Sequence, residues 1–146
     1  MKITIGSDHG AVELKDAVKK VLTDLKIEFD DVGTFGTDAV DYPDIAEKVC
    51  ADVVSGKSER GIVLCGTGIG ISIAANKIHG IRCALCNDVY SAKKSREHND
   101  ANVLALGGRV LGFGLAEEIV RAWFSADFEG GRHERRINKI SALEKK

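Results

Sequence analysis

The feature that most constrains this chain is an alternation of short apolar runs with longer amphipathic ones. Runs rich in β-branched residues predict strands, and apolar residues spaced by three and four predict the helices between them. Such alternation is typical of a parallel sheet, because parallel strands need crossover connections. The strands are expected at 2–5, 28–32, 61–64, 81–86 and 103–106, and the helices at 12–25, 42–54, 69–77, 90–96, 111–124 and 132–143.

The length of 146 residues suits one domain with its own core. No linker, internal repeat or low-complexity stretch divides the chain. We therefore expect a single domain over residues 1–146, folded as a Rossmann-like three-layer α/β sandwich. Its five-stranded parallel sheet would carry helices on both faces, since the continuous apolar runs at 61–64 and 103–106 suit strands buried on both sides.

Charge and hydropathy exclude several classes of partner. The formal net charge is −1, which favours neither nucleic acid nor an anionic membrane. No apolar run is long enough to cross a bilayer, and the first residues lack the features of a secretory signal. These observations predict a cytoplasmic protein.

Four cysteines are present, and in such a protein they are expected to be reduced. Cys83 and Cys86 have the CxxC spacing of some metal and redox sites. They fall in an apolar run that predicts a buried strand, where side chains three apart point to opposite faces. We therefore favour packing over a thiol redox function for this pair. Cys50 lies on the apolar face of a predicted helix and is also expected in the core.

Ligands of parallel α/β sheets bind at the carboxyl ends of the strands. This rule directs attention to the turns after Ile5, Leu64, Cys86 and Leu106. The turn after Leu64 contains alternating glycines and leads into a helix, so its N–H groups and the helix dipole suit an oxyanion or a phosphate. A plain tight turn explains the glycines equally well. Neither a dinucleotide fingerprint nor a P-loop fits, because Ile71 replaces a required glycine and no Gly-Lys-Ser/Thr follows.

Cys65 makes a catalytic role for this turn plausible. A thiol beside a helix N-terminus forms the thiolate more readily than a free one, so Cys65 is a candidate base or nucleophile. Asp8 and His9 follow the first strand at the same edge, although Asp8 could simply cap the first helix. His98 is a candidate general acid, because histidine exchanges protons near neutral pH.

Phosphate could be held by arginines near the end of the chain. Arg132 and Arg136 are four residues apart and share one helix face, a spacing that suits an anion. A solvated basic face paired with Glu134 and Glu144 is the simpler alternative. The loop with Arg109 follows the last strand, at the expected ligand-binding edge.

An ordered set of short motifs resembles the RpiB/LacAB family of sugar-phosphate isomerases over nearly the whole chain. The matching segments are Ser7–His9, Asp41–Pro43, Cys65–Gly70 with Ser72–Lys77, His98–Asn102 and Gly130–His133. The resemblance implies interconversion of ribose 5-phosphate and ribulose 5-phosphate without a metal or cofactor. One branch of this family uses a glutamate after the glycine loop as base. Cys65 and Ile71 match the other branch, which uses a cysteine.

The resemblance also implies a role for each matching residue. Cys65 would move the proton between the sugar carbons C2 and C1, and Thr67 and His98 would assist ring opening and proton movement, with His98 as the acid. Asp8 and His9 would contact the substrate, and Asn99 would bind its hydroxyls. The N–H groups of Gly66, Thr67, Gly68, Ile69 and Gly70 would hold the enediolate oxygens, and Arg109, Arg132 and Arg136 would hold the phosphate.

The same resemblance also concerns how the chain assembles and how long its substrate is. Family members form homodimers or homotetramers with active sites at the subunit boundary. Galactose-6-phosphate isomerases divide the site between two different chains, whereas this chain keeps Cys65, His98, Arg132 and Arg136 together and should be self-sufficient. A six-carbon aldose phosphate remains an alternative substrate. A non-catalytic phosphosugar-binding module remains an alternative function, although a binder needs neither Cys65 nor His98.

Overall fold

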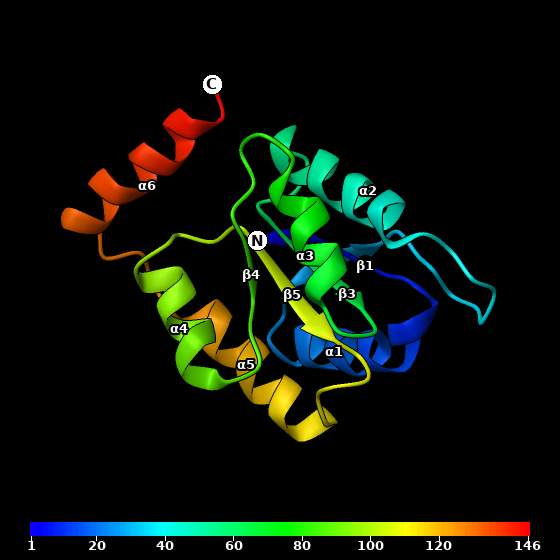
Figure 1. The fold of residues 1–146 in the computed structure, drawn as a ribbon. Helices are drawn as coiled ribbons and strands as arrows, with labels where there is room; N and C mark the ends of the chain where they lie inside the picture. Colours follow the sequence, from blue (N-terminus) through cyan, green and yellow to red (C-terminus); the bar gives the residue numbers. More distant parts are fainter.

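The computed structural model describes residues 1–146 and contains one five-stranded parallel sheet between two layers of helices (Figure 1). The spatial order of the strands is β2-β1-β3-β5-β4, so the chain reverses its winding direction after β2. All neighbouring strands pair in parallel, as expected from the alternating sequence pattern. The strands are β1 (Lys2–Ser7), β2 (Glu28–Asp31), β3 (Arg60–Cys65), β4 (Cys83–Leu85) and β5 (Val103–Gly107).

Six α-helices and one short 3₁₀ turn connect the strands. Their bounds agree with the sequence prediction to within two residues at each end. The helices are α1 (Val12–Asp24), α2 (Tyr42–Val54), α3 (Ile69–Asn76), α4 (Val89–Glu97), α5 (Phe113–Ser125) and α6 (Arg132–Leu143), with the turn η1 (His9–Ala11) before α1. None of these helices is both long and apolar enough to cross a membrane.

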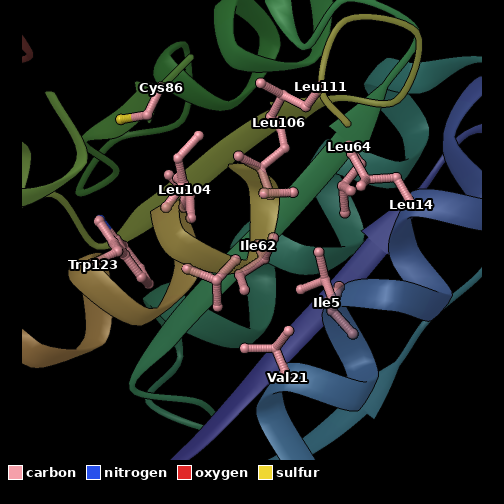
Figure 2. Packing of buried hydrophobic residues seen from close by; sticks show 14 of the residues in the cluster. Ile5, Leu14, Val21, Ile62, Leu64, Cys86, Leu104, Leu106, Leu111 and Trp123 are labelled. Carbon is pink, nitrogen blue, oxygen red and sulfur yellow. The ribbon is translucent and has the colours of Figure 1, made fainter. Parts of the chain in front are cut away.

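Two separate cores cover the two faces of the sheet. On one face, side chains of β1, β3 and β5 pack against α1 and α5, and the fully buried Trp123 of α5 lies at one end of this cluster (Figure 2). On the other face, alternate residues of β3 and β5 pack against α2 and α3. Successive strand residues therefore change face: Leu64 belongs to the first core and Cys65 to the second.

The strand expected at 81–86 differs from the prediction. β4 covers only Cys83–Leu85, lies at the edge of the sheet, and its three residues are half-buried. An edge strand pairs on one side only, so its apolar run does not require full burial. The predicted separation of the two thiols is confirmed, because Cys86 belongs to the first core and Cys83 packs against the second.

The chemistry of the three remaining cysteines agrees with a packing role. Burial raises the pKa of Cys50 to about 12 and that of Cys86 to about 11. The pKa of Cys83 is raised as well, again chiefly by burial. These thiols stay protonated at neutral pH, and none is bonded to another cysteine.

One buried charge fastens the segment that follows β2. The Nζ atom of Lys15 in α1 is inaccessible to solvent and donates to Oδ1 of Asp31 at 2.9 Å and to the carbonyl oxygen of Thr34 at 2.6 Å. Burial alone would raise the pKa of Asp31, but hydrogen bonds from Lys15, the N–H of Gly33 and Lys19 hold it below its usual value. These bonds hold the segment after β2 against α1.

Candidate active site

The loops after β1, β3 and β5 interlock at the carboxyl edge of the sheet. The N–H of Asp8 donates to the carbonyl oxygen of Leu64 at 3.0 Å. The N–H groups of Gly108 and Arg109 donate to the carbonyl oxygens of Cys65 and Gly66, both at 2.9 Å. These main-chain bonds tie the loops of the three central strands into one unit around the end of β3.

Cys65 ends β3, and its side chain is 4% exposed on the face covered by α2 and α3. Its Sγ atom accepts a hydrogen bond from the N–H of Gly68 at 3.2 Å. A donor in this position orients the sulfur and stabilises negative charge on it. Gly68 makes the bond possible because its φ of +78° turns the chain sharply before α3.

The loop after Cys65 presents unused hydrogen-bond donors. The N–H groups of Gly66, Thr67 and Gly70 donate to no other group of the protein. The N–H of Ile69 is partly satisfied, since it donates to Oγ1 of Thr67 at 3.2 Å. Donors at the start of a helix, added to its dipole, attract negative charge. The loop therefore has the free N–H donors that an oxyanion or phosphate site, as predicted from the sequence, would need.

Asp8 and His9 lie at the same edge, in the turn before α1. Asp8 is buried, and its Oδ1 atom accepts from the N–H of Gly10 at 2.8 Å, so the capping role considered for Asp8 is present. His9 is exposed, and its Nδ1 atom accepts from the N–H of Val40 at 3.2 Å. This bond leaves Nε2 of His9 for a ligand or solvent.

Arg109 extends from the loop after β5 toward the glycine loop. A methyl group on Gly66 would lie 3.4 Å from Nη1 of Arg109, so the guanidinium lies directly over that glycine. A pocket of about 450 Å³ lies beside it, lined by His9, Gly108, Arg109 and the exposed ring of Phe35, among others. A cation in this position can bind the phosphate of a substrate whose other end reaches Cys65.

The structure adds Tyr42 to the residues predicted for this edge. Its ring packs on Gly70, where a methyl group would lie only 2.7 Å from the ring carbon Cζ. Tyr42 opens α2 and is 39% exposed. The segment Asp41–Pro43 belongs to the family resemblance, but its sequence pattern alone indicates only the start of a helix. Contact with the glycine loop could not be inferred from it.

Four of the predicted site residues do not join this cluster within one chain. α4 runs back across the sheet for nine residues, about 13 Å, so His98 and Asn99 lie near the amino edge of the strands. There the carbonyl oxygen of Asn102 accepts from the N–H of Gly61, at the beginning of β3. The other two residues, Arg132 and Arg136, lie on α6, which stands on the opposite side of the molecule from the tips of β3 and β5 (Figure 1).

A second cluster forms where α4 ends and α6 begins. The imidazole rings of His98 and His133 stack with their centroids 4.1 Å apart and their planes within 10°. Their Nε2 atoms lie 3.7 and 3.5 Å from Oε1 of Glu129. Burial, followed by the charges of His98 and Arg132, lowers the pKa of His133, so its ring is neutral near pH 7. Glu129 was not expected, and His133 had no assigned role.

Comparison with known proteins identifies the family to which the chain belongs. Residues 3–140 match the model of a family described as Ribose/Galactose Isomerase. The chain is 48% identical over 145 residues to ribose-5-phosphate isomerase B of Escherichia coli, covering 99% of this chain and 97% of the relative. It is 44% identical to D-erythrulose-4-phosphate isomerase of Pectobacterium atrosepticum, covering 99% and 95% of the two chains.

A solved structure agrees in fold as well as sequence. Ribose-5-phosphate isomerase B of Clostridium thermocellum superposes with a TM-score of 0.97, at 56% identity, over 99% of this chain and 98% of that one. The family match extends through the strands, the glycine loop and most of α6. The chain therefore belongs to the ribose/galactose isomerase family of sugar-phosphate isomerases.

Proposed function

We propose that this protein interconverts D-ribose 5-phosphate and D-ribulose 5-phosphate through an enediolate intermediate. The observation that carries the proposal is the position of the Cys65 sulfur beside the free N–H groups of Gly66, Thr67 and Gly70. An aldose–ketose isomerase needs a base for a carbon-bound proton and donors for the oxygen that becomes negative. Both are built into one rigid turn, and the relatives from E. coli and C. thermocellum carry the name of this activity.

Each step assigns a proton to a named group. The thiolate of Cys65 removes the proton on C2, and the electron pair of that C–H bond forms the C1–C2 double bond of the enediolate. The loop N–H groups hold the negative oxygen. This oxygen is O1, and the hydroxyl proton of O2 then passes to it. Cys65 returns the proton taken from C2 to C1, so C1 carries the hydroxyl, O2 becomes the ketone oxygen and the thiolate is regenerated. A positioned base contributes ~10²–10⁴-fold to such a reaction, and one oxyanion donor ~10²–10³-fold.

The acid and part of the phosphate site come from a second copy of the chain. His98 and Asn99 lie at the amino edge of the sheet, whereas Cys65 lies at the carboxyl edge, so one chain does not bring them together. A homodimer, or a tetramer made of two such dimers, supplies them across a twofold interface. On this assignment, His98 assists ring opening as the acid, Asn99 binds a hydroxyl, and the Arg132 and Arg136 guanidiniums join Arg109 on the phosphate.

Exposed apolar side chains on α3, α4 and α6 supply surface that such an interface can bury. Ile69 and Ile73 of α3 are four residues apart on one helix face and are 52% and 56% exposed, beside the glycine loop. Tyr90, at the start of α4, is 71% exposed. Ile140 and Leu143 of α6 are also exposed. Groups of exposed large apolar residues mark association surfaces.

The direct test is conversion of ribose 5-phosphate by the purified protein in the presence of a chelator. We expect turnover, with Cys65→Ala inactive. Binding of the sugar phosphate without any turnover would instead support the phosphosugar-binding module.

Substrate length needs its own comparison. The relative named as a D-erythrulose-4-phosphate isomerase makes four-carbon phosphates a second candidate class. Measuring kcat/KM for four-, five- and six-carbon aldose phosphates assigns the substrate, and the proposal expects the five-carbon compound to lead. A higher kcat/KM for allose 6-phosphate or galactose 6-phosphate would favour the six-carbon alternative.

A further inference from the structure

Two imidazoles and one carboxylate meet where α4 ends and α6 begins. The ligand-type atoms of His98, Glu129 and His133 all lie within 4.8 Å of one another. Nε2 of His98 and Nε2 of His133 lie 3.7 and 3.5 Å from the same oxygen of Glu129. Both contacts are longer than hydrogen bonds, so these three groups are near one another without being bonded.

We propose that His98, Glu129 and His133 bind a divalent transition-metal ion of the zinc type. Two imidazoles and a carboxylate are a common three-ligand set for Zn²⁺, with water in the fourth position. Bonds of 2.0–2.2 Å place ligand atoms about 3.3 Å apart in a tetrahedral site. The two contacts to Glu129 already approach this spacing. The stacked rings need only splay toward the ion, and His98 has room because its side chain is 35% exposed.

Main-chain hydrogen bonds hold the three ligands in place. The N–H of Glu129 donates to the carbonyl oxygen of Glu97 at 3.0 Å, which fastens the loop before α6 to the end of α4. The N–H of His98 donates to Lys94, and that of His133 donates to Gly130. A site held by its backbone loses little entropy when an ion binds.

The surrounding charges limit the affinity. Glu97 and Glu129 favour a cation, whereas Arg132 and Arg136 on the same helix as His133 oppose one. Because metal affinity follows the Irving–Williams order, Cu²⁺ and Ni²⁺ will also bind such imidazole ligands. The site thus suits reversible binding of available transition metals rather than permanent retention of one ion.

The consequence for activity rests on the proposed function. His98 is the acid supplied to the partner's site, and an ion on its Nε2 atom withholds that nitrogen from proton transfer. Metal binding is thereby inhibitory, and a chelator restores turnover. Metal binding itself does not depend on the isomerase assignment.

Calorimetric titration of the metal-free full-length protein with Zn²⁺ tests the site. We expect one ion per chain, with affinity reduced about tenfold or more in Glu129→Gln, because the variant keeps the shape but loses a charged ligand. Glu134→Gln is the matched control: Glu134 is exposed on α6 and outside the cluster, so its variant should bind like the wild type. Equal affinity of Glu129→Gln and wild type overturns the proposal.

A thiol could bind Zn²⁺ as well, so the ligand type needs a separate measurement. Co²⁺ bound at the proposed site should lack the intense near-ultraviolet charge-transfer band of a cobalt thiolate, and Cys65→Ala should bind it equally well. A thiolate band that disappears in Cys65→Ala would overturn the assignment to the histidines.

Turnover measured with and without Zn²⁺ separates the two proposals. Each protein is compared with its own turnover in chelator: added Zn²⁺ should inhibit the wild type, and Glu129→Gln should resist this inhibition. Metal bound with full activity would contradict the acid role of His98 while leaving the metal site intact.

Discussion

The N–H of Gly68 donates a hydrogen bond to the sulfur of Cys65 at 3.2 Å. This single contact links the last residue of β3 to the N-cap residue of α3, so the geometry of the turn and the position of the proposed base are set together. A change at either residue should therefore alter both the chemistry and the local fold, to different extents.

Replacing Cys65 tests the base. Cys65→Ala should lower kcat by ~10²–10⁴-fold, because the positioned base is lost. Binding of the sugar phosphate, measured by calorimetry, should persist, because the loop N–H groups and arginines remain. Cys83→Ala is the matched control, since its thiol packs in β4, and it should keep near wild-type turnover. Substantial activity in Cys65→Ala would remove the base assignment.

Replacing Gly68 tests the turn. Its φ of +78° disfavours a side chain, and a methyl group there would lie 2.6 Å from Cδ1 of Leu85 and 2.9 Å from the carbonyl carbon of Leu106. Gly68→Ala should lower the free energy of unfolding by ~2–4 kcal/mol through strain and overpacking. Urea unfolding measures the loss, and turnover should fall because the donor to Cys65 moves.

Gly114→Ala gives the control for that experiment. Gly114 lies in α5, has open space where a methyl group would be added, and does not have a positive φ. Alanine favours a helix over glycine by ~0.5–1 kcal/mol, so this variant should be as stable as the wild type or more stable. A similar loss in both variants would mean that strain at Gly68 is not the cause.

Mixed dimers test whether the site is shared. Cys65→Ala and His98→Asn should each be inactive alone. After co-refolding in equal amounts, half of the dimers are mixed and each has one site with both native residues, which predicts about a quarter of wild-type activity. Turnover that stays at the level of the single variants would place Cys65 and His98 in the same subunit's site.

Arg132→Ala tests the phosphate contact. A lost charge-assisted hydrogen bond is worth ~1.5–3 kcal/mol, so KM should rise about tenfold or more while kcat changes less. Arg135→Ala supplies the control, since Arg135 is an exposed neighbour on α6 with no proposed role. A loss confined to kcat would contradict phosphate binding by Arg132.

Acid should weaken the fold partly through Asp31. Hydrogen bonds from Lys15, Gly33 and Lys19 outweigh burial and hold the pKa of Asp31 below its usual value. The folded pKa is thus below the unfolded one of about 3.9, so the stabilisation is complete above that pH and is lost as pH falls through the folded value. Urea unfolding from pH 6 to pH 2 should show this loss, and Asp31→Asn should show a shallower dependence.

The Asp31→Asn variant leaves Lys15 buried without its charged partner, which by itself can be strongly destabilising. The double variant Lys15→Met with Asp31→Asn removes both charges and provides the comparison. Its acid dependence should match that of Asp31→Asn. A dependence as steep as the wild type's would assign the acid sensitivity to other carboxylates.

Much of the fold could be predicted because its signals are local. The helix over 42–54 was predicted with its observed ends, since Pro43 marks its first turn and its apolar face follows a regular spacing. The burial of β4 was overestimated for a different reason. Its apolar run resembles that of a central strand, and only the sheet order places Cys83–Leu85 at an edge.

The site was predictable to the extent that strand ends determine it. Asp8, Cys65 and Arg109 follow three adjacent strands, so a parallel sheet brings them to one edge. His98 follows a helix instead, and the direction of α4 takes it to the other edge. The meeting of Glu129 with His133 and His98 depends on the path of a glycine-containing loop, which residue spacing does not specify.

The placement of Cys65 and His98 at opposite edges of one sheet has a consequence for concentration. A folded monomer with both cores complete would still lack the proposed acid beside its own Cys65. On the shared-site proposal, specific activity should therefore fall on dilution below the dimer dissociation constant, without any loss of secondary structure. Newly made chains would become active upon meeting one another, so catalysis would begin at assembly rather than at folding.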